Sequence, residues 1–362
     1  MEQRQQVYEL DRKIVSIHSE DRNIDKWPNP NNFEVTLPQD FLNVQSIRLV
    51  NVNFPSVIYT FSNEYQNTKF RFKLIPHTTN TAIKDNLEQK LNNPTNPNDY
   101  FEVEINEGTY DPEQLAFELT QKMNRVVSDY LGSPYDKFVV RANTVNYKIL
   151  IGNTCDEPIL LFNQKIDYTL SCNQKIVWDQ PIKWGLPYFL GFNKQEIQSI
   201  SYEEFYVDYD GDDTPWLEPS TDSSINKVWV AQSNHTYQLL GENELYIELD
   251  NHNSITELTP YPRTLNNNTQ FIGETKSAFA KISIFNPTSA QIFDSRNGFL
   301  TNLTHYTRPI ERIRKMKFKV RFHDGRLVDF KNREWGMTIE INQLIDKPLY
   351  RMNIQQPQLY RL

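Results

Sequence analysis

The chain has 362 residues, of which 38% are hydrophobic, 13% aromatic and 23% charged, and its formal net charge is −8. This length is enough to bury a large core in one or two domains, and the many aromatic residues favour half-buried strands. The negative charge argues against general nucleic-acid binding, and the scarcity of glycine, 11 residues in all, argues against phosphate-binding loops.

The first part of the chain predicts four β-strands, because apolar and polar side chains alternate there in four separate segments. In the second segment Phe33 and Val35 point to one face and Glu34 to the other. Pro38 and Pro55 mark strand ends, where proline is tolerated. The four segments are residues 13–19, 31–39, 44–55 and 68–76.

Between the first two strands, residues 18–22 (HSEDR) combine a base, a nucleophile and two acids, as an active site would. Alternation along an extended chain sends neighbouring side chains to opposite faces, and a catalytic triad is normally assembled from distant segments. We therefore interpret this stretch as a stiff connector. In it, we expect Asp21, Asn23 and Asp25 to close Asx-turns, Trp27 to be an apolar anchor, and Arg22 to pair with Asp25 or a neighbouring acid.

The middle of the chain predicts one strong amphipathic helix at about 110–129, after an Asn-, Thr- and Pro-rich loop at 76–99. Asp111 is a suitable N-cap, Pro112 suits the first helical position, and Gln114 completes a capping box. At helical spacing, one face carries the apolar residues Leu115, Ala116, Leu119, Met123, Val126 and Val127. We expect this face to pack against a sheet.

Short strands separated by turn residues are predicted in the rest of the chain. The Asp324-Gly325 pair predicts a hairpin between two alternating segments. The predicted strands are residues 100–106, 137–143, 146–153, 158–164, 187–193, 243–251, 277–286, 314–322, 327–330 and 335–343.

This pattern predicts a mainly β fold: a jelly-roll-like antiparallel β-sandwich with one embedded amphipathic helix and long loops. We expect a single β-sandwich domain at 1–342, with loops inserted at 76–99 and 208–226. Residues 343–362 lack periodicity and predict an extended C-terminal tail. No run approaches the about 18 apolar residues of a membrane span, and the polar N-terminal stretch predicts no signal peptide.

Motifs for metal or catalytic chemistry are missing from the sequence. The acidic stretch 208–213 places Gly211 at position four, which breaks the frame of an EF-hand, so a solvated loop is favoured and a calcium site left open. The six histidines are scattered, and neither a G-x-S-x-G nor a nucleotide-binding glycine motif is present. Cys155 and Cys172 predict free thiols in a reducing compartment. We therefore expect no enzyme and no cofactor.

A basic stripe is predicted near the C-terminus, where Lys317, Lys319 and Arg321 alternate with apolar residues. One interpretation is a solvated strand face that protects a sheet edge from aggregation. The other is a contact surface for an acidic protein or, less in keeping with the net charge of −8, for nucleic acid.

Five segments together resemble a known family when taken in order. They are SEDRNIDKWPNPNNFEVTLPQDFLNVQSIRLVNVNFP (19–55), INEGTYDPEQLAFELTQKMN (105–124), LPYFLGF (186–192), SAFAKISI (277–284) and RPIERIRKMKFKVRFHDGRLVDFKNREWGMTIEI (308–341). The chain resembles the minor capsid and penton-type virion proteins of large nucleocytoplasmic DNA viruses.

The resemblance implies a non-enzymatic structural component of an icosahedral capsid, a minor capsid or penton protein built on a jelly-roll-like sandwich. It implies contacts with the major capsid protein and other minor capsid proteins, and a homo-oligomer as one arrangement, a pentamer at the vertex. It places the chain in the virion, assembled in the host cytoplasm, without a membrane span, cofactor or nucleic-acid partner.

We expect partner contacts through the two long loops, the tail and the basic stripe. The candidate residues are Trp27, Asp208, Asp210, Asp212, Asp213, Trp216, Lys317, Lys319, Arg321, Tyr350 and Tyr360. The alternative hypothesis is a carbohydrate-binding or carbohydrate-cleaving β-sandwich, in which YVDYDGDDTPW (206–216) supplies sugar-stacking rings and a carboxylate pair.

Overall fold

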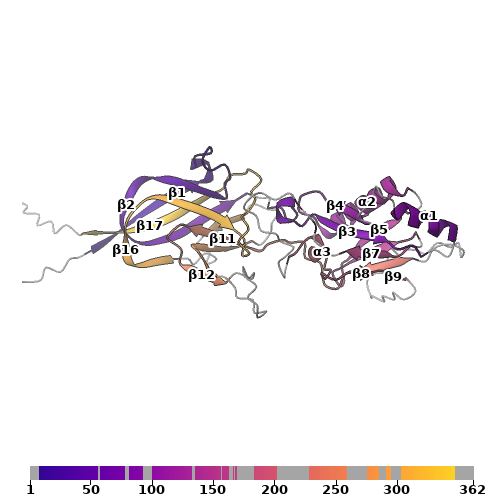
Figure 1. The fold of residues 1–362 in the computed structure, drawn as a ribbon. Coiled ribbons are helices and arrows are strands. Elements are labelled where there is room, and N and C mark those ends of the chain that lie inside the picture. The colour runs from indigo at the N-terminus through magenta and orange to yellow at the C-terminus, as the bar shows by residue number, and fades with distance from the viewer. Residues whose placement is uncertain are drawn as a thin grey trace, which may run out of the picture.

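The structure is a computed structural model that describes residues 8–55, 58–77, 81–92, 100–132, 135–155, 157–162, 166, 168, 183–201, 228–258, 275–284, 291–294 and 303–346. The fold is mainly β, built from antiparallel sheets with few helices, and is consistent with the predicted jelly-roll-like sandwich (Figure 1). The strands are β1 (Tyr8–His18), β2 (Asn32–Phe54), β3 (Lys69–Leu74), β4 (Phe101–Glu104), β5 (Phe138–Asn143), β6 (Lys148–Asn153), β7 (Ile159–Phe162), β8 (Ile197–Gln198), β9 (Ile200–Ser201), β10 (Trp229–Gln232), β11 (Glu244–Leu249), β12 (Ile255–Leu258), β13 (Thr275–Ala278), β14 (Ala280–Ser283), β15 (Gln291–Asp294), β16 (Leu303–Arg321) and β17 (Gly336–Asp346). The helices are α1 (Thr81–Leu91), α2 (Pro112–Tyr130) and α3 (Leu186–Phe189), with 3-10 turns η1 (Ser19–Asp21) and η2 (Asn63–Tyr65).

One end of the molecule, here the large lobe, is a curled sheet with strand order β1-β17-β2-β16-β11-β14 (Figure 1). The long strand β2 changes partners along its length. It pairs with β16 over residues 32–48, and its second half also pairs with β17 and, over residues 51–54, with β15. The long strands β2 and β16 therefore run from one part of the curled sheet into the other.

Strand β2 corrects the prediction of two strands ended by Pro38, because the chain stays extended through this proline. Thr36 pairs with Lys315 and Phe41 with Ile313, so residues 37–40 lie opposite a single residue of β16. Pro38 therefore falls in a bulge, where no ladder bond needs its missing N–H. A bulge also bends and twists a strand, which suits the curl of the sheet.

The other end, here the small lobe, contains two four-stranded sheets, β5-β6-β10-β9 and β4-β3-β7-β8, together with the helices (Figure 1). Each lobe has its own cluster of buried side chains. In the large lobe the centre is aromatic, with Phe33, Phe54, Phe318, Phe330 and Trp335 in ring contact. In the small lobe the apolar face of α2 packs beside Phe72, Phe101 and Phe138.

Several predicted elements are present and three differ. The hairpin β5–β6 and the strands β3, β4, β7, β11 and β17 lie where alternation predicted them. The 76–99 segment, expected as a loop, contains α1, and residues 187–193, expected as a strand, begin within the helical turn α3. Proline suits the first turn of a helix, which explains Pro187 there. After the Asp324-Gly325 turn the chain makes one bridge, Arg321 to Leu327, and no extended strand.

The domain limits predicted from the sequence, 1–342 and a tail from 343, stay a prediction. Pairing of β17 with β1 continues as far as Asp346, so residues 343–346 belong to a strand. The predicted loop at 208–226 lies outside the described residues. None of the helices in the described ranges combines the length and apolar character needed to cross a bilayer.

Helix α2 confirms the predicted amphipathic helix and its cap. The Asp111 side chain accepts a hydrogen bond from the Gln114 backbone N–H at 2.7 Å, and Gln114 Oε1 accepts one from the Asp111 N–H at 3.2 Å. Leu115, Leu119 and Met123 are fully buried on its inner face. The cap satisfies donors that the first helical turn leaves without intrahelical partners.

Replacing Asp111 with alanine is expected to lower the free energy of unfolding by about 1 kcal/mol, because the hydrogen bond from the capping side chain is lost. Urea denaturation followed by circular dichroism measures the change. The matched control is Asp129→Ala, an exposed acid in the last turn of the same helix, where a negative charge opposes the helix dipole. Equal losses for the two variants would contradict the capping role.

Candidate functional site

The 18–22 connector is fixed to the end of the large lobe by Arg22, which is buried. Its guanidinium donates to the carboxylate of Glu334, to the Trp27 carbonyl at 2.9 Å and to the Pro28 carbonyl at 3.2 Å. Ser19 Oγ also donates to Glu334. Burial alone would raise the pKa of Glu334, but these hydrogen bonds and the Arg22 charge hold it below its usual value. Residues 18–22 therefore connect β1 with the segment that leads to β2, but the acid that Arg22 binds is the distant Glu334 and not the predicted Asp25 or a neighbouring acid.

Trp27 follows the connector and packs, partly buried, against the large-lobe core. Two ammonium groups flank its ring, Lys26 Nζ at 5.3 Å and Lys317 Nζ at 5.1 Å from the centroid. Both distances fall within the range of cation–π attraction. The structure therefore brings together two of the predicted contact residues, Trp27 and Lys317, at one place on the outer face of the sheet.

Arg321 departs from the predicted basic stripe, because its side chain is 0% exposed. It binds the carboxylates of Glu248 and Glu257, and its guanidinium lies 5.0 Å from the centre of the Tyr246 ring. The paired strands β12 and β13 supply Glu257 and the Ser277 carbonyl that Arg321 contacts. Alternation places Arg321 on the outer face of β16, but a second layer of chain covers that face. Lys319 remains at the surface, 3.5 Å from Glu248.

The other predicted contact residues lie outside the described residues. They are Asp208, Asp210, Asp212, Asp213, Trp216, Tyr350 and Tyr360. The two alternatives for the acidic loop at 208–213, a solvated loop or a calcium site, therefore stay predictions. Within the described ranges, no three His, Cys, Asp or Glu side chains lie close enough together to hold a metal ion.

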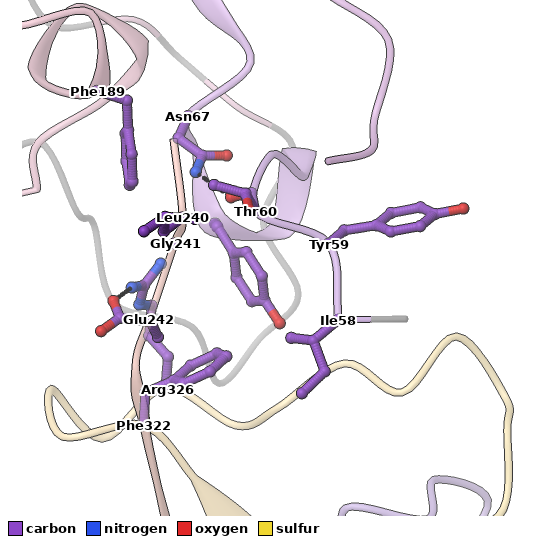
Figure 2. A pocket seen from close by; sticks show the side chains of 11 residues that line it. Ile58, Tyr59, Thr60, Asn67, Phe189, Leu240, Gly241, Glu242, Phe322 and Arg326 are labelled. Atoms are coloured by element: carbon purple, nitrogen blue, oxygen red, sulfur yellow. Dashed lines mark hydrogen bonds and ion pairs between the residues drawn. The ribbon is translucent and has the colours of Figure 1, made fainter. Parts of the chain in front are cut away.

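The two lobes meet at a small cavity of about 20 Å³, which has room for about one water molecule (Figure 2). In the described part of the chain, residues 58–68 and 233–243 pass between the lobes at this point. The first crossing brings Thr60 and Tyr65 to the cavity, and the second brings Gly241 and Glu242. The α3 helix contributes Phe189 from the small lobe.

Arg326 is the charged centre of this lobe junction. Its Nε donates to Asp324 at 2.6 Å and its Nη2 to Glu242 at 2.9 Å, and the guanidinium lies 5.0 Å from the centre of the Tyr65 ring (Figure 2). Lys183 from the small lobe also binds Glu242. Burial alone would lower the Arg326 pKa, but the charges of Asp324 and Glu242 hold it above its usual value. The junction therefore contains a buried cation with two carboxylate partners.

Further bonds join the lobes beside Arg326. Lys331 of the large lobe binds Glu107 of the small lobe at 3.0 Å, and Glu107 also accepts from the Asn63 N–H at 2.8 Å. The Tyr65 hydroxyl accepts from the Asp329 N–H at 3.0 Å. Burial raises the pKa of Tyr65, so its hydroxyl stays protonated. Several ionic and aromatic contacts in one place hold the lobes in a fixed relative position.

A wider groove of about 600 Å³ lies on the small lobe beside α3. Its lining combines the aromatic residues Trp184, Tyr188 and Phe192 with the polar residues His235 and Gln238. The Tyr188 hydroxyl donates to Gln238 Oε1 at 3.2 Å, and His235 Nε2 lies 2.9 Å from Asn193 Oδ1. The lining also includes Lys194, whose ammonium lies 5.9 Å from the centre of the Trp184 ring, and this mixture of polar groups and aromatic rings suits a polar ligand.

Gly191 allows the backbone to pass at the base of this groove. Its φ is +86°, and a Cβ there would lie 2.2 Å from the His235 carbonyl oxygen. Gly191→Ala is expected to lower the free energy of unfolding by about 1–3 kcal/mol. The matched control is Gly132→Ala, which has φ of +79° but no atom within 4 Å of the added Cβ. Both variants share the strain of a positive φ, but only Gly191→Ala adds a clash with the His235 carbonyl. Thermal unfolding of both variants therefore separates the two effects, and equal losses would contradict the close approach of Gly191 to His235.

Sequence reasoning did not identify the lobe junction or the groove. Asp324 and Arg326 lie two residues apart, but their partner Glu242 comes from a distant segment of the chain, so no local motif unites the three. One signal was present in the HDGR turn, where an acid and a base flank a glycine with φ of +88°.

Two solved structures are similar to this chain over nearly its whole length. The mavirus penton protein is 11% identical over 93% of this chain and 100% of that chain, with a TM-score of 0.42. A chain from the 3.5 Å cryo-EM structure of the Sputnik virophage is 12% identical over 92% and 98%, with a TM-score of 0.40. Identities and TM-scores this low carry no argument about function.

A search of curated proteins finds no match. One family model, described as "Family of unknown function (DUF5901)", matches residues 6–306. That match spans most of the sequence and includes the connector, α2, the groove and the second crossing between the lobes. The chain therefore belongs to the family of unknown function DUF5901.

Proposed function

We propose that this chain is a non-enzymatic structural component of the icosahedral capsid of a large DNA virus. The observation that carries the proposal is the ordered set of segments that resemble minor capsid and penton-type virion proteins. Those segments fall on the framework of the fold: 19–55 contains η1 and β2, 105–124 contains most of α2, and 308–341 contains most of β16 and part of β17. The resemblance thus involves residues that build both cores.

The outer faces of the large lobe support a role in lateral contacts. Strand β16 presents Arg312, Arg314 and Lys315 at the surface, where Asp40 and Glu34 only partly balance them. Paired charges on a rigid sheet favour complementary protein surfaces over a small ligand. The partners that we propose are the major capsid protein and other minor capsid proteins, reached also through the segment 76–99 that contains α1, the segment 208–226 and the tail.

The finer assignment is a minor capsid or penton protein of a nucleocytoplasmic large DNA virus, assembled in the host cytoplasm. A position at the vertex requires a five-fold ring of copies. A position beneath the capsomers requires contacts with several different neighbours instead.

Mass spectrometry of purified particles of the virus that encodes this chain tests the proposal. We expect the chain in a constant ratio to the major capsid protein, retained after protease treatment and salt washes that remove adsorbed host proteins. A chain found only in infected-cell lysate, or removed by the washes, would refute a capsid role.

A second candidate function is carbohydrate binding, which the groove beside α3 favours. Sugar rings stack on aromatic side chains and use amide and hydroxyl partners, such as Gln238 and Tyr188. Glycan-array binding by the purified chain, lost in Gln238→Ala and kept in the exposed control Gln198→Ala, would support it. No binding, or binding that both variants keep, would remove this candidate.

A further inference from the structure

Strand β1 forms one edge of the large-lobe sheet, and in the described part of the chain its only strand partner is β17. One row of its backbone N–H and C=O groups therefore faces away from the sheet. An edge of this kind is a template for pairing with another strand, and proteins commonly protect it with proline, short length, bulges or charged side chains. β1 is eleven residues long and contains no proline.

The outer face of β1 is apolar and exposed along its first part. Tyr8, Leu10 and Ile14 are 53%, 55% and 61% exposed, and Leu10 lies directly opposite Leu344 of β17. The one charge between them, Arg12, binds Glu340 at 2.6 Å. The Arg12 charge on this face is therefore balanced by Glu340, and the exposed side chains of Tyr8, Leu10 and Ile14 carry no charge.

The opposite edge of the same sheet differs. Strand β14 has four residues, and Lys281 on it binds Glu244 at 2.6 Å. Its remaining outward residue is Ser283, so it offers a short polar edge. A second chain gains little apolar contact there. The other edge strand of this sheet, β15, also has only four residues, so β1 is the long edge among the described strands of the sheet.

The charges of β1 show which strand suits it. Two acids, Glu9 and Asp11, precede two bases, Arg12 and Lys13, so the segment 8–14 has no net charge. When a second copy of the segment is laid alongside in the antiparallel direction about Asp11, Glu9 of each copy lies opposite Lys13 of the other. Tyr8 lies opposite Ile14 and Leu10 opposite Arg12 in the same register. Opposite charges and apolar pairs directly across an antiparallel ladder stabilise it.

We propose that β1 pairs antiparallel with β1 of a second copy of this chain, about a two-fold axis at Asp11, to join two large-lobe sheets into one. The register keeps each side chain on its own face, because even-numbered residues meet even-numbered ones. The two Asp11 carboxylates meet at the axis, and each lies 3.1 Å from Lys13 of its own chain. An isologous contact of this kind is the commonest symmetry of soluble oligomers. The inference does not depend on the capsid proposal.

Cysteine cross-linking tests the register, in a background where Cys155 and Cys172 are replaced by serine. Asp11→Cys is expected to form a disulfide-linked dimer under mild oxidation, because residues directly opposite across a ladder have Cα atoms at a bridgeable distance. Glu9→Cys is expected to cross-link when mixed with Lys13→Cys and not by itself. The control is Ser283→Cys on β14. Cross-linking of Asp11→Cys no stronger than that of the control would overturn the proposal.

Charge reversal tests the pairing without oxidation. Sedimentation equilibrium is expected to show a dimer whose Kd rises about tenfold or more in Lys13→Glu, since each Glu9 then faces a second carboxylate across the ladder. Adding Glu9→Lys restores the opposite charges and is expected to recover the dimer. Circular dichroism confirms that each variant is folded. A wild-type chain that stays monomeric at about 100 μM, or a double variant as weak as the single one, would overturn the proposal.

Discussion

Replacing Arg326 with alanine will lower the free energy of unfolding by about 3–5 kcal/mol, because the change leaves the buried Asp324 carboxylate without its ion-pair partner and Glu242 with Lys183 alone. Asp324 and Glu242 keep little exposure, and Arg326 is the cation that binds both of them at the lobe junction. The guanidinium also fills space between the rings of Tyr65 and Phe322. Both the charge balance and the packing between the lobes are lost together.

Guanidinium denaturation monitored by tryptophan fluorescence measures this loss. The control is Lys315→Ala, which removes an exposed ion pair with Glu34 and is expected to change stability by at most about 1 kcal/mol. A second variant, Arg326→Met, keeps much of the volume and removes the charge, so it separates packing from electrostatics. Losses below about 1 kcal/mol for Arg326→Ala would contradict the junction as described.

The pH dependence of stability gives a further signature of the same pair. Burial alone would raise the Asp324 pKa, but the Arg326 charge and hydrogen bonds hold it below its usual value. A carboxyl with a lowered pKa in the folded state contributes stability above its unfolded pKa and loses it as pH falls through the folded pKa. In Arg326→Ala that support is absent, so acid unfolding is expected at a higher pH than in the wild type.

Replacing Trp335 with alanine is the second change with a large expected effect, a loss of about 3–5 kcal/mol. Trp335 is 3% exposed, and its ring centroid lies 5.3 Å from that of Phe54 and 5.8 Å from that of Phe33. Its indole N–H donates to the Pro30 carbonyl at 2.8 Å, and its backbone N–H donates to Ser19 Oγ at 2.9 Å. The residue therefore joins the aromatic core to the connector.

Trp335→Phe separates these two roles, because it keeps an aromatic ring but leaves the Pro30 carbonyl without its donor. We expect it to lose about 1–3 kcal/mol. Phe117→Ala is the surface control, since Phe117 is 66% exposed on α2, and its expected change is within about 0.5 kcal/mol. Urea denaturation compares the three variants, and equal losses in Trp335→Ala and Phe117→Ala would contradict the aromatic core.

Much of the fold could be predicted from local pattern, because alternation and capping are local properties. The alternation of Phe70, Phe72 and Leu74 predicted β3, and the Asp111 cap predicted the start of α2. What failed depended on partners distant in the chain. Pro38 was expected to end a strand, yet it lies in a bulge that the register of β16 creates. The start of the LPYFLGF segment was expected to be extended, yet it forms a helical turn whose apolar residues pack in the small-lobe core.

The candidate site was less predictable, since surface chemistry depends on what covers each face. Alternation assigned Arg321 correctly to the outer face of β16, but only the structure places β12 and β13 over it. Arg22 was expected to bind an acid, and the acid is Glu334, whose separation from it along the chain is 312 residues. Long-range pairs such as Arg326 with Glu242 give no local signal at all.

The position of this chain in an icosahedral reconstruction of the virus particle tests the central claim most directly. We predict density that fits the large and small lobes at a fixed, symmetry-related place in the capsid shell, in contact with the major capsid protein. A reconstruction in which every capsid density is accounted for by other proteins would contradict the claim.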